Sequence, residues 1–158
     1  MSTPQPQTRP ELRDPPRSMT PDDRELVIVA RDLLERIYVS GRHEVVAAVR
    51  TSSGRIYTGV HVEGSSRRSS VCAEGVALGA ALAGCATRGE PFEVASIVSV
   101  LRRPTGTLHL IEPCGVCAEL ITDYAPEARV WAAPTDSDGE VEPMLARELL
   151  PMKRRRMW

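Results

Sequence analysis

The sequence predicts one α/β domain, a three-layer α/β/α sandwich built around a mixed sheet of five strands. The order of the expected elements, a helix followed by β-β-α-β-α-β-β, favours this class because such helices cover both faces of a sheet. A length of 158 residues is typical of one domain, and 42% apolar residues are enough for one core. Aromatic residues make up only 4%, so the core must be mainly aliphatic.

The first helix is expected to follow an unstructured N-terminus. Six of the 13 prolines lie between residues 4 and 21 among polar and charged residues, which predicts a disordered tail over residues 1–19. Thr20-Pro21 is then a typical helix start, because threonine caps helices and proline suits the first turn. Residues 25–39 carry apolar side chains three and four apart, which predicts a helix with one apolar face. We expect the folded domain to span residues 20–151 and a basic tail to follow over residues 152–158.

The remaining elements follow from β-branched runs, turn residues and small-residue patterns. They are strands at 45–50 and 55–62 around a glycine-containing turn, a close-packed Ala/Gly helix at 71–86, a buried strand at 94–101, a strand or strand extension at 108–111, a helix at 114–124, a strand at 129–133, a turn at 136–139, a short strand at 140–143 and a helical turn or two at 144–150. About seven residues separate the last two strands, too few for a parallel crossover, so these strands should be antiparallel.

Composition argues against several classes of protein. The formal net charge of −1 provides no overall field toward nucleic acid or anionic membranes, and no apolar run reaches membrane-spanning length. The N-terminus lacks the hydrophobic core of a secretory signal. In a cytoplasmic protein, which we therefore expect, four cysteines indicate metal-binding or catalytic thiols rather than disulfides.

Two cysteine motifs at predicted helix starts carry the chemistry: Cys72-Ala73-Glu74 and Pro113-Cys114-Gly115-Val116-Cys117. A catalytic zinc site takes three protein ligands and keeps its fourth position for water, and Cys72, Cys114 and Cys117 supply three thiolates. Glu74, two residues after the first cysteine, can exchange a proton with that water without being a ligand. The other ligand types, at Cys85, His61 and His109, lie outside both motifs, so we expect an open site rather than a structural one.

These motifs resemble the cytidine deaminase family, in particular the small homotetrameric branch that contains the blasticidin S deaminases. The resemblance covers about residues 22–151 and includes Ser53-Gly54-Arg55-Ile56-Tyr57-Thr58-Gly59-Val60, Asp136-Ser137-Asp138-Gly139 and Arg147-Glu148-Leu149-Leu150-Pro151. It implies Zn²⁺ on the three cysteines, Glu74 as proton shuttle, and hydrolytic loss of the 4-amino group of a pyrimidine as ammonia. It also implies that the backbone N–H of Ala73 binds the pyrimidine carbonyl.

The sequence departs from the family pattern around the substrate. The family's sugar-binding Asn-x-Glu is here His61-Val62-Glu63, in which Glu63 fits a sugar-hydroxyl acceptor and His61 offers a larger hydrogen-bonding ring. Gly75 stands where the family has an arginine that offsets the negative charge of the three thiolates. Two alternatives follow: Arg67 or Arg68 compensates for this charge, or both are solvated residues of the loop. In the family an aromatic residue near the C-terminus closes over a neighbouring subunit's site, and Trp158 is placed to do the same.

The sequence thus supports a cytoplasmic homotetrameric zinc deaminase of a small cytosine nucleoside such as cytidine or deoxycytidine. One alternative is a deaminase of a cytosine nucleoside antibiotic such as blasticidin S. Another is a catalytically silent, zinc-stabilised binding module. A short, antiparallel final strand pair without an intervening helix disfavours the polynucleotide-editing branch.

Overall fold

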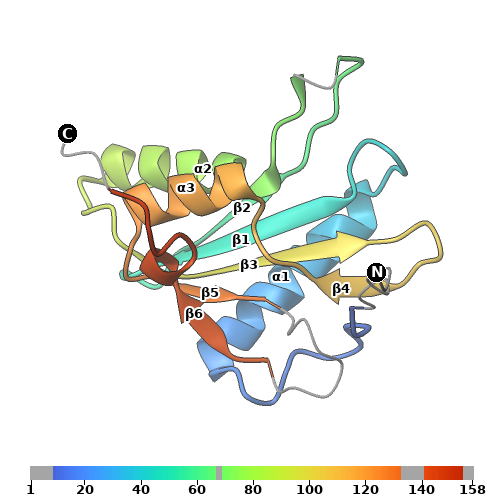
Figure 1. Ribbon diagram of the computed structural model, residues 1–158, viewed down its shortest axis with the longest axis horizontal. Helices are drawn as coiled ribbons and strands as arrows, with labels where there is room; N and C mark the ends of the chain where they lie inside the picture. Colours follow the sequence, from blue (N-terminus) through green and yellow to red (C-terminus); the bar gives the residue numbers. More distant parts are fainter. Residues whose placement is uncertain (1–8, 67–68, 133–140, 155–158) are drawn as a thin grey trace, which may run out of the picture.

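Three layers make up the molecule, as the sequence predicts. The computed structural model describes residues 9–66, 69–132 and 141–154. Helix α1 (Pro21–Ile37) covers one face of the sheet, and α2 (Ala73–Arg88) and α3 (Gly115–Tyr124) lie side by side on the other (Figure 1). Each face of the sheet carries its own core cluster, so the central strands are buried on both sides.

In the part of the chain that the structure describes, the sheet has six strands, one more than expected. They are β1 (Val45–Thr51), β2 (Ile56–Val60), β3 (Val94–Arg102), β4 (Leu108–Leu110), β5 (Arg129–Trp131) and β6 (Pro143–Leu145). The order is β2-β1-β3-β5-β6. On the side of β3 that faces away from β1, the first half of the strand pairs with β5 and the second half pairs with β4. Only β3 and β5 are parallel, and the predicted antiparallel arrangement of the last two strands is confirmed.

Helix α1 begins where the sequence predicts. The Thr20 hydroxyl accepts a hydrogen bond from the backbone N–H of Asp23 at 3.2 Å, and Pro21 is the first helical residue. The Asp23 carboxylate is fully buried and accepts hydrogen bonds from Arg129 Nε at 3.0 Å and Trp131 Nε1 at 2.9 Å. This network ties the start of α1 to β5.

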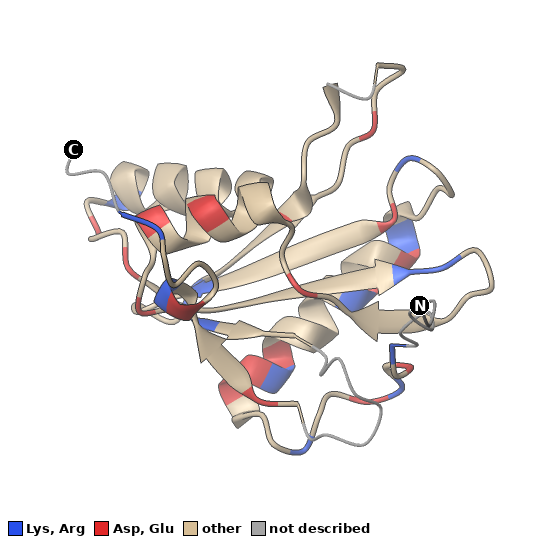
Figure 2. Ribbon diagram, in the orientation of Figure 1, with Lys and Arg blue, Asp and Glu red and all other residues tan. Residues whose placement is uncertain are grey.

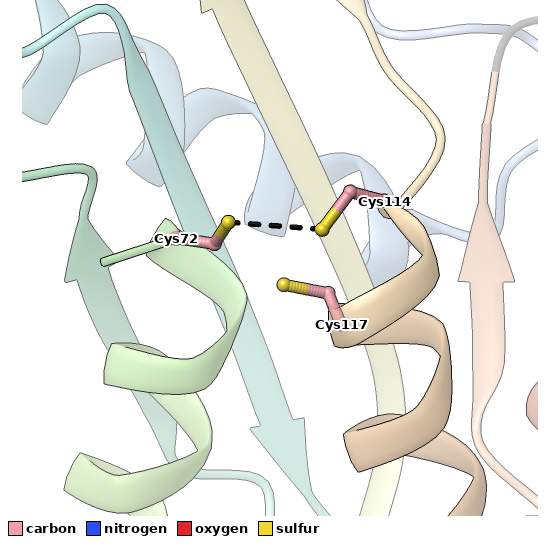
Figure 3. Close-up of side chains that lie close together, drawn as sticks. All are labelled: Cys72, Cys114 and Cys117. Atoms are coloured by element: carbon pink, nitrogen blue, oxygen red, sulfur yellow. Dashed lines mark hydrogen bonds between the residues drawn. The ribbon is translucent and has the colours of Figure 1, made fainter. Parts of the chain in front are cut away.

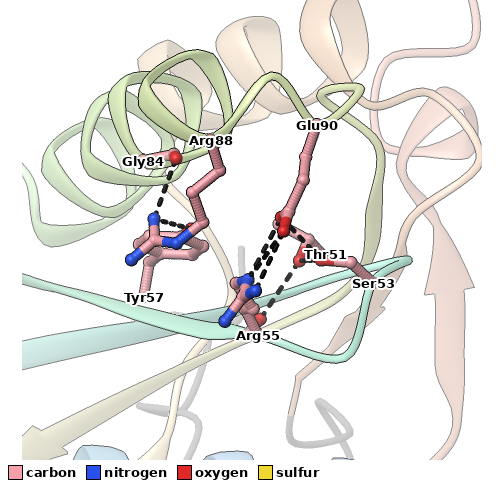
Figure 4. Close-up of polar contacts among 7 residues, drawn as sticks. All are labelled: Thr51, Ser53, Arg55, Tyr57, Gly84, Arg88 and Glu90. Carbon is pink, nitrogen blue, oxygen red and sulfur yellow. Dashed lines mark hydrogen bonds and ion pairs between the residues drawn. The ribbon is translucent and has the colours of Figure 1, made fainter.

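Helix α2 packs unusually closely on β2, and two glycines make this possible. A Cβ on Gly59 of β2 would lie 2.2 Å from the carbonyl oxygen of Ala73, and one on Gly84 would lie 2.3 Å from the ring of Tyr57. Figure 4 shows the far end of α2, where the Arg55 guanidinium binds Glu90 at 2.9 Å. The small-residue run of α2 is thus a packing surface.

The C-terminal elements differ from the prediction. The last strand lies at Pro143–Leu145 rather than 140–143, and a single 3₁₀ turn, Ala146–Glu148, replaces the helix expected over 144–150. Pairing with β5 fixes the strand, because Met144 lies opposite Val130. Ala146 is fully buried, and its backbone N–H donates a hydrogen bond to the carbonyl of Ala128. Because residues 143–145 pair as a strand up to this point, an α-helix does not begin at Met144. The predicted turn at 136–139 lies outside the described residues.

The N-terminal segment takes part in the core. A disordered tail was expected over residues 1–19, of which residues 1–8 lie outside the described residues. In the described part, the side chains of Leu12 and Met19 are buried against the α1 face of the sheet. These two buried apolar side chains help to hold residues 9–19 in place, even though the average composition of the segment is polar.

Charge is distributed without a dominant sign. Figure 2 shows acidic and basic segments interspersed over the described chain. None of its helices has the length and apolar character needed to cross a lipid bilayer.

Candidate active site

The three predicted cysteine ligands come together at the adjacent N-termini of two helices (Figure 3). Cys72 and Cys114 precede the first residues of α2 and α3, and Cys117 lies in the first turn of α3. Their sulfur atoms all lie within 4.8 Å of one another, and those of Cys72 and Cys114 are 3.7 Å apart. Two thiolates bound to one tetrahedral zinc at about 2.3 Å stand about 3.8 Å apart, so this arrangement fits the ion.

The electrostatics of the cluster also call for a cation. Burial, together with the negative charge of Glu74, raises the pKa of the Cys117 thiol, and burial with the neighbouring Cys114 raises that of Cys72. Burial also acts to raise the pKa of Cys114, but the backbone N–H of Cys117 and the other thiols outweigh this and lower it. Three sulfur anions therefore need a divalent ion between them.

Glu74 lies beside this cluster in a closed environment. It is the second residue of α2, and 4% of its surface is exposed. One carboxylate oxygen accepts a hydrogen bond from the Ser99 hydroxyl at 3.0 Å, and the other lies 3.4 Å from the Cys117 sulfur. The sequence did not indicate Ser99, although a serine within an apolar strand is a weak signal of a buried hydrogen bond.

A pocket of about 220 Å³ opens onto Glu74 and two of the cysteines. Its described lining consists of Glu44, Val45, His61, Cys72, Ala73, Glu74, Ile111, Glu112 and Cys114. No Lys or Arg belongs to this part of the lining, and Glu44 and Glu112 are pocket residues that the sequence did not indicate. The pocket is therefore acidic.

The remaining predicted site residues divide into two groups. His61 and Ala73 line the pocket, and Ala73, as the first residue of α2, has a backbone N–H without a partner inside the helix. Glu63 lies behind His61, accepting from its Nε2 at 3.0 Å and from the Ser70 hydroxyl at 2.6 Å. Trp158 lies outside the described residues, as do Arg67 and Arg68.

Cys85 does not join the cluster. It is buried on α2, thirteen residues after Cys72, or about 20 Å along the helix axis. It fills the core as a small apolar side chain.

Comparison with known proteins agrees with this geometry. A family model described as "Cytidine and deoxycytidylate deaminase zinc-binding region" matches residues 20–133. The chain belongs to this family. It is a zinc-dependent hydrolytic deaminase, and the three-cysteine cluster fits Zn²⁺ as the cofactor.

Individual deaminases are similar along most of their length. Blasticidin-S deaminase of Bacillus cereus is 35% identical over 141 residues, which cover 86% of this chain and 94% of that protein. The cytidine deaminase of Burkholderia pseudomallei superposes with a TM-score of 0.65 at 31% identity, covering 85% of this chain and 98% of the other. That of Bacillus anthracis gives 0.63 at 25% identity, with 83% and 88% covered.

Proposed function

We propose that this deaminase hydrolyses the 4-amino group of a cytosine nucleoside, giving the uracil form and ammonia. The observation that carries this proposal is the Glu74 carboxylate, buried at the pocket floor beside three converging cysteines and held by Ser99. A structural zinc site would have no use for an unliganded buried carboxylate next to the metal ligands.

Each group at the pocket floor has a role in this proposal. Cys72, Cys114 and Cys117 would hold the Zn²⁺ ion, which would supply Lewis acidity for the activation of water. Once Cys117 is a thiolate it no longer donates to Glu74, whose oxygen is then free to accept the water's proton. Glu74 returns this proton to the departing amine, so one water is consumed and one ammonia is released. The backbone N–H of Ala73 holds the pyrimidine carbonyl.

The candidate substrates fall into two classes that differ at the sugar end: cytidine or deoxycytidine, and an antibiotic such as blasticidin S. His61 lines the pocket where the resemblance places a sugar ligand, and Glu63 already accepts two hydrogen bonds from protein groups. We therefore propose that His61 contacts this part of the substrate and that Glu63 orients its ring. The similarity to Blasticidin-S deaminase over 94% of that protein supports the antibiotic class.

Ammonia release from cytidine, deoxycytidine and blasticidin S, measured side by side on zinc-loaded protein, separates these classes. Glu74→Gln should abolish turnover while zinc content, measured by atomic emission, stays at one ion per chain. Glu93→Gln, which changes an exposed control carboxylate in the segment directly before β3, should behave as the wild type. If Glu74→Gln kept full activity, the proposed mechanism would be wrong.

A stable zinc-loaded wild type that turns over no aminated pyrimidine or purine would instead support the silent binding module. No observation on the described residues favours that alternative, because it leaves the Ser99–Glu74 hydrogen bond without a purpose.

We further propose that the enzyme is a cytoplasmic homotetramer. Four free cysteines fit a reducing compartment. Leu82 of α2 lines one shallow pocket with Leu120 and Tyr124 of α3, and all three side chains are exposed. This apolar face is suited to contact with another copy. Leu120→Glu should reduce the mass measured by light scattering, whereas an unchanged mass would exclude this face. If Trp158 closes over a neighbouring subunit's site, the Trp158→Ala variant of the assembled enzyme should have a raised KM.

A further inference from the structure

The N-terminal segment reaches the rim of the active-site pocket. Figure 1 shows it beside β4, and two polar contacts attach it there. The backbone N–H of Leu12 donates to the carbonyl of Leu108 at 2.7 Å, and His109 Nδ1 lies 2.9 Å from the carbonyl oxygen of Pro10. Because Leu12 is also buried, residues 10–12 are held at both backbone and side chain.

Arg9 extends this attachment to the pocket itself. Its guanidinium binds both carboxylate oxygens of Glu112, from Nε at 3.2 Å and from Nη2. Glu112 lines the pocket and lies two residues before Cys114. A bidentate ion pair between a guanidinium and a carboxylate fixes the plane of the carboxylate better than a single hydrogen bond does.

This pair matters because of the charge of the pocket. Glu44, Glu74 and Glu112 contribute three carboxylates to the lining. Arg9 is the only Lys or Arg in the described part of the chain that forms an ion pair with any of them. Each oxygen of Glu112 retains a further lone pair and can still accept from a ligand while bound to Arg9.

We propose that Arg9 is a positioning residue that holds Glu112 on the pocket wall, where Glu112 accepts a hydrogen bond from the sugar or side group of the nucleoside. This inference rests on the proposed function. The described lining offers carboxylate acceptors and no Lys or Arg, which suits hydroxyl or ammonium groups of a ligand and disfavours a phosphate, so nucleosides should be preferred over nucleotides.

Steady-state kinetics on the full-length zinc enzyme test this role. Arg9→Gln should raise KM about threefold to tenfold, the range for a partly exposed two-point pair, and leave kcat within about twofold. Glu112→Gln should raise KM similarly, and the double variant should be no worse than Glu112→Gln alone. Arg13→Gln is the matched control, because Arg13 lies in the same segment but pairs only with Glu11 at 3.1 Å.

Three outcomes would overturn the inference. They are an unchanged KM in Arg9→Gln, an equal rise in Arg13→Gln, and an undiminished effect of Arg9→Gln when Glu112 is already glutamine. Arg9→Lys, which keeps the charge but loses the two-point geometry, should recover part of the affinity. If the wild type releases no ammonia, the proposed function is wrong. If the wild type is active and Arg9→Gln has the same KM, only the proposed role of Arg9 is wrong.

Discussion

Replacing Ser99 by alanine should slow the reaction without removing zinc. Alternate residues of β3 face opposite sides of the sheet, and Ser99 faces α2, where its hydroxyl lies 3.0 Å from Glu74. Both side chains are buried, so water does not readily replace the lost donor. A hydrogen bond to a charged group contributes about 1.5–3 kcal/mol, which corresponds to roughly a 10- to 100-fold lower kcat if the carboxylate must keep its orientation.

The comparison requires a control of equal burial. Ser96→Ala removes a fully buried hydroxyl from the same strand, but on the face toward α1, so kcat should stay within about twofold. The assay follows ammonia release at saturating substrate, together with zinc content and thermal unfolding. A Ser99→Ala enzyme with wild-type kcat, or a Ser96→Ala enzyme that is equally slow, would refute the idea that Ser99 orients Glu74.

Three further results are expected. Cys114→Ser should lose stoichiometric zinc by atomic emission, whereas Cys85→Ala, remote from the cluster, should retain it. Gly59→Ala should cost about 2 kcal/mol or more in urea unfolding, because its Cβ would lie 2.2 Å from a backbone oxygen of α2, whereas Gly79→Ala has nothing within 4 Å and should be neutral or stabilising. Burial alone would raise the pKa of Asp23, but the hydrogen bonds from Arg129 and Trp131 outweigh this effect, so the pKa is lowered. Its ionised form therefore stabilises the fold fully above the unfolded pKa of about 3.9, and this stabilisation is lost as the pH falls through the folded pKa. Asp23→Asn should lower stability at pH 7 by about 2 kcal/mol and flatten its dependence on pH below about 4.

Elements with strong local signals were predictable from the sequence. Thr20-Pro21 marks the start of α1 because capping depends on residues within one turn, and the β1–β2 hairpin follows from its glycine-containing turn. The last strand was misplaced because a three-residue strand has almost no periodicity of its own. Its limits depend on which residues pair with β5, and Met144 opposite Val130 is a tertiary outcome.

The site shows the same division. The convergence of the three cysteines was predictable because Cys114 and Cys117 lie one helical turn apart and Cys72 precedes a second predicted helix, in which Glu74 is the second residue. Ser99 acts through a partner 25 residues away and Arg9 through one 103 residues away, so no local pattern marks them. The average composition of residues 1–19 likewise gave no sign of the burial of Leu12, because that burial depends on contacts with residues far away in the sequence.

Close packing and metal geometry are coupled in this molecule through one end of α2. Gly59 allows the backbone of β2 to approach Ala73, the residue between the ligand Cys72 and the carboxylate Glu74. Any residue with a Cβ at position 59 must shift this end of the helix and so disturb the arrangement in which the sulfurs of Cys72 and Cys114 lie 3.7 Å apart. Gly84, at the other end of the helix, meets only the side chain of Tyr57. A larger residue at position 84 should therefore reduce stability without weakening zinc binding, whereas one at position 59 should reduce both.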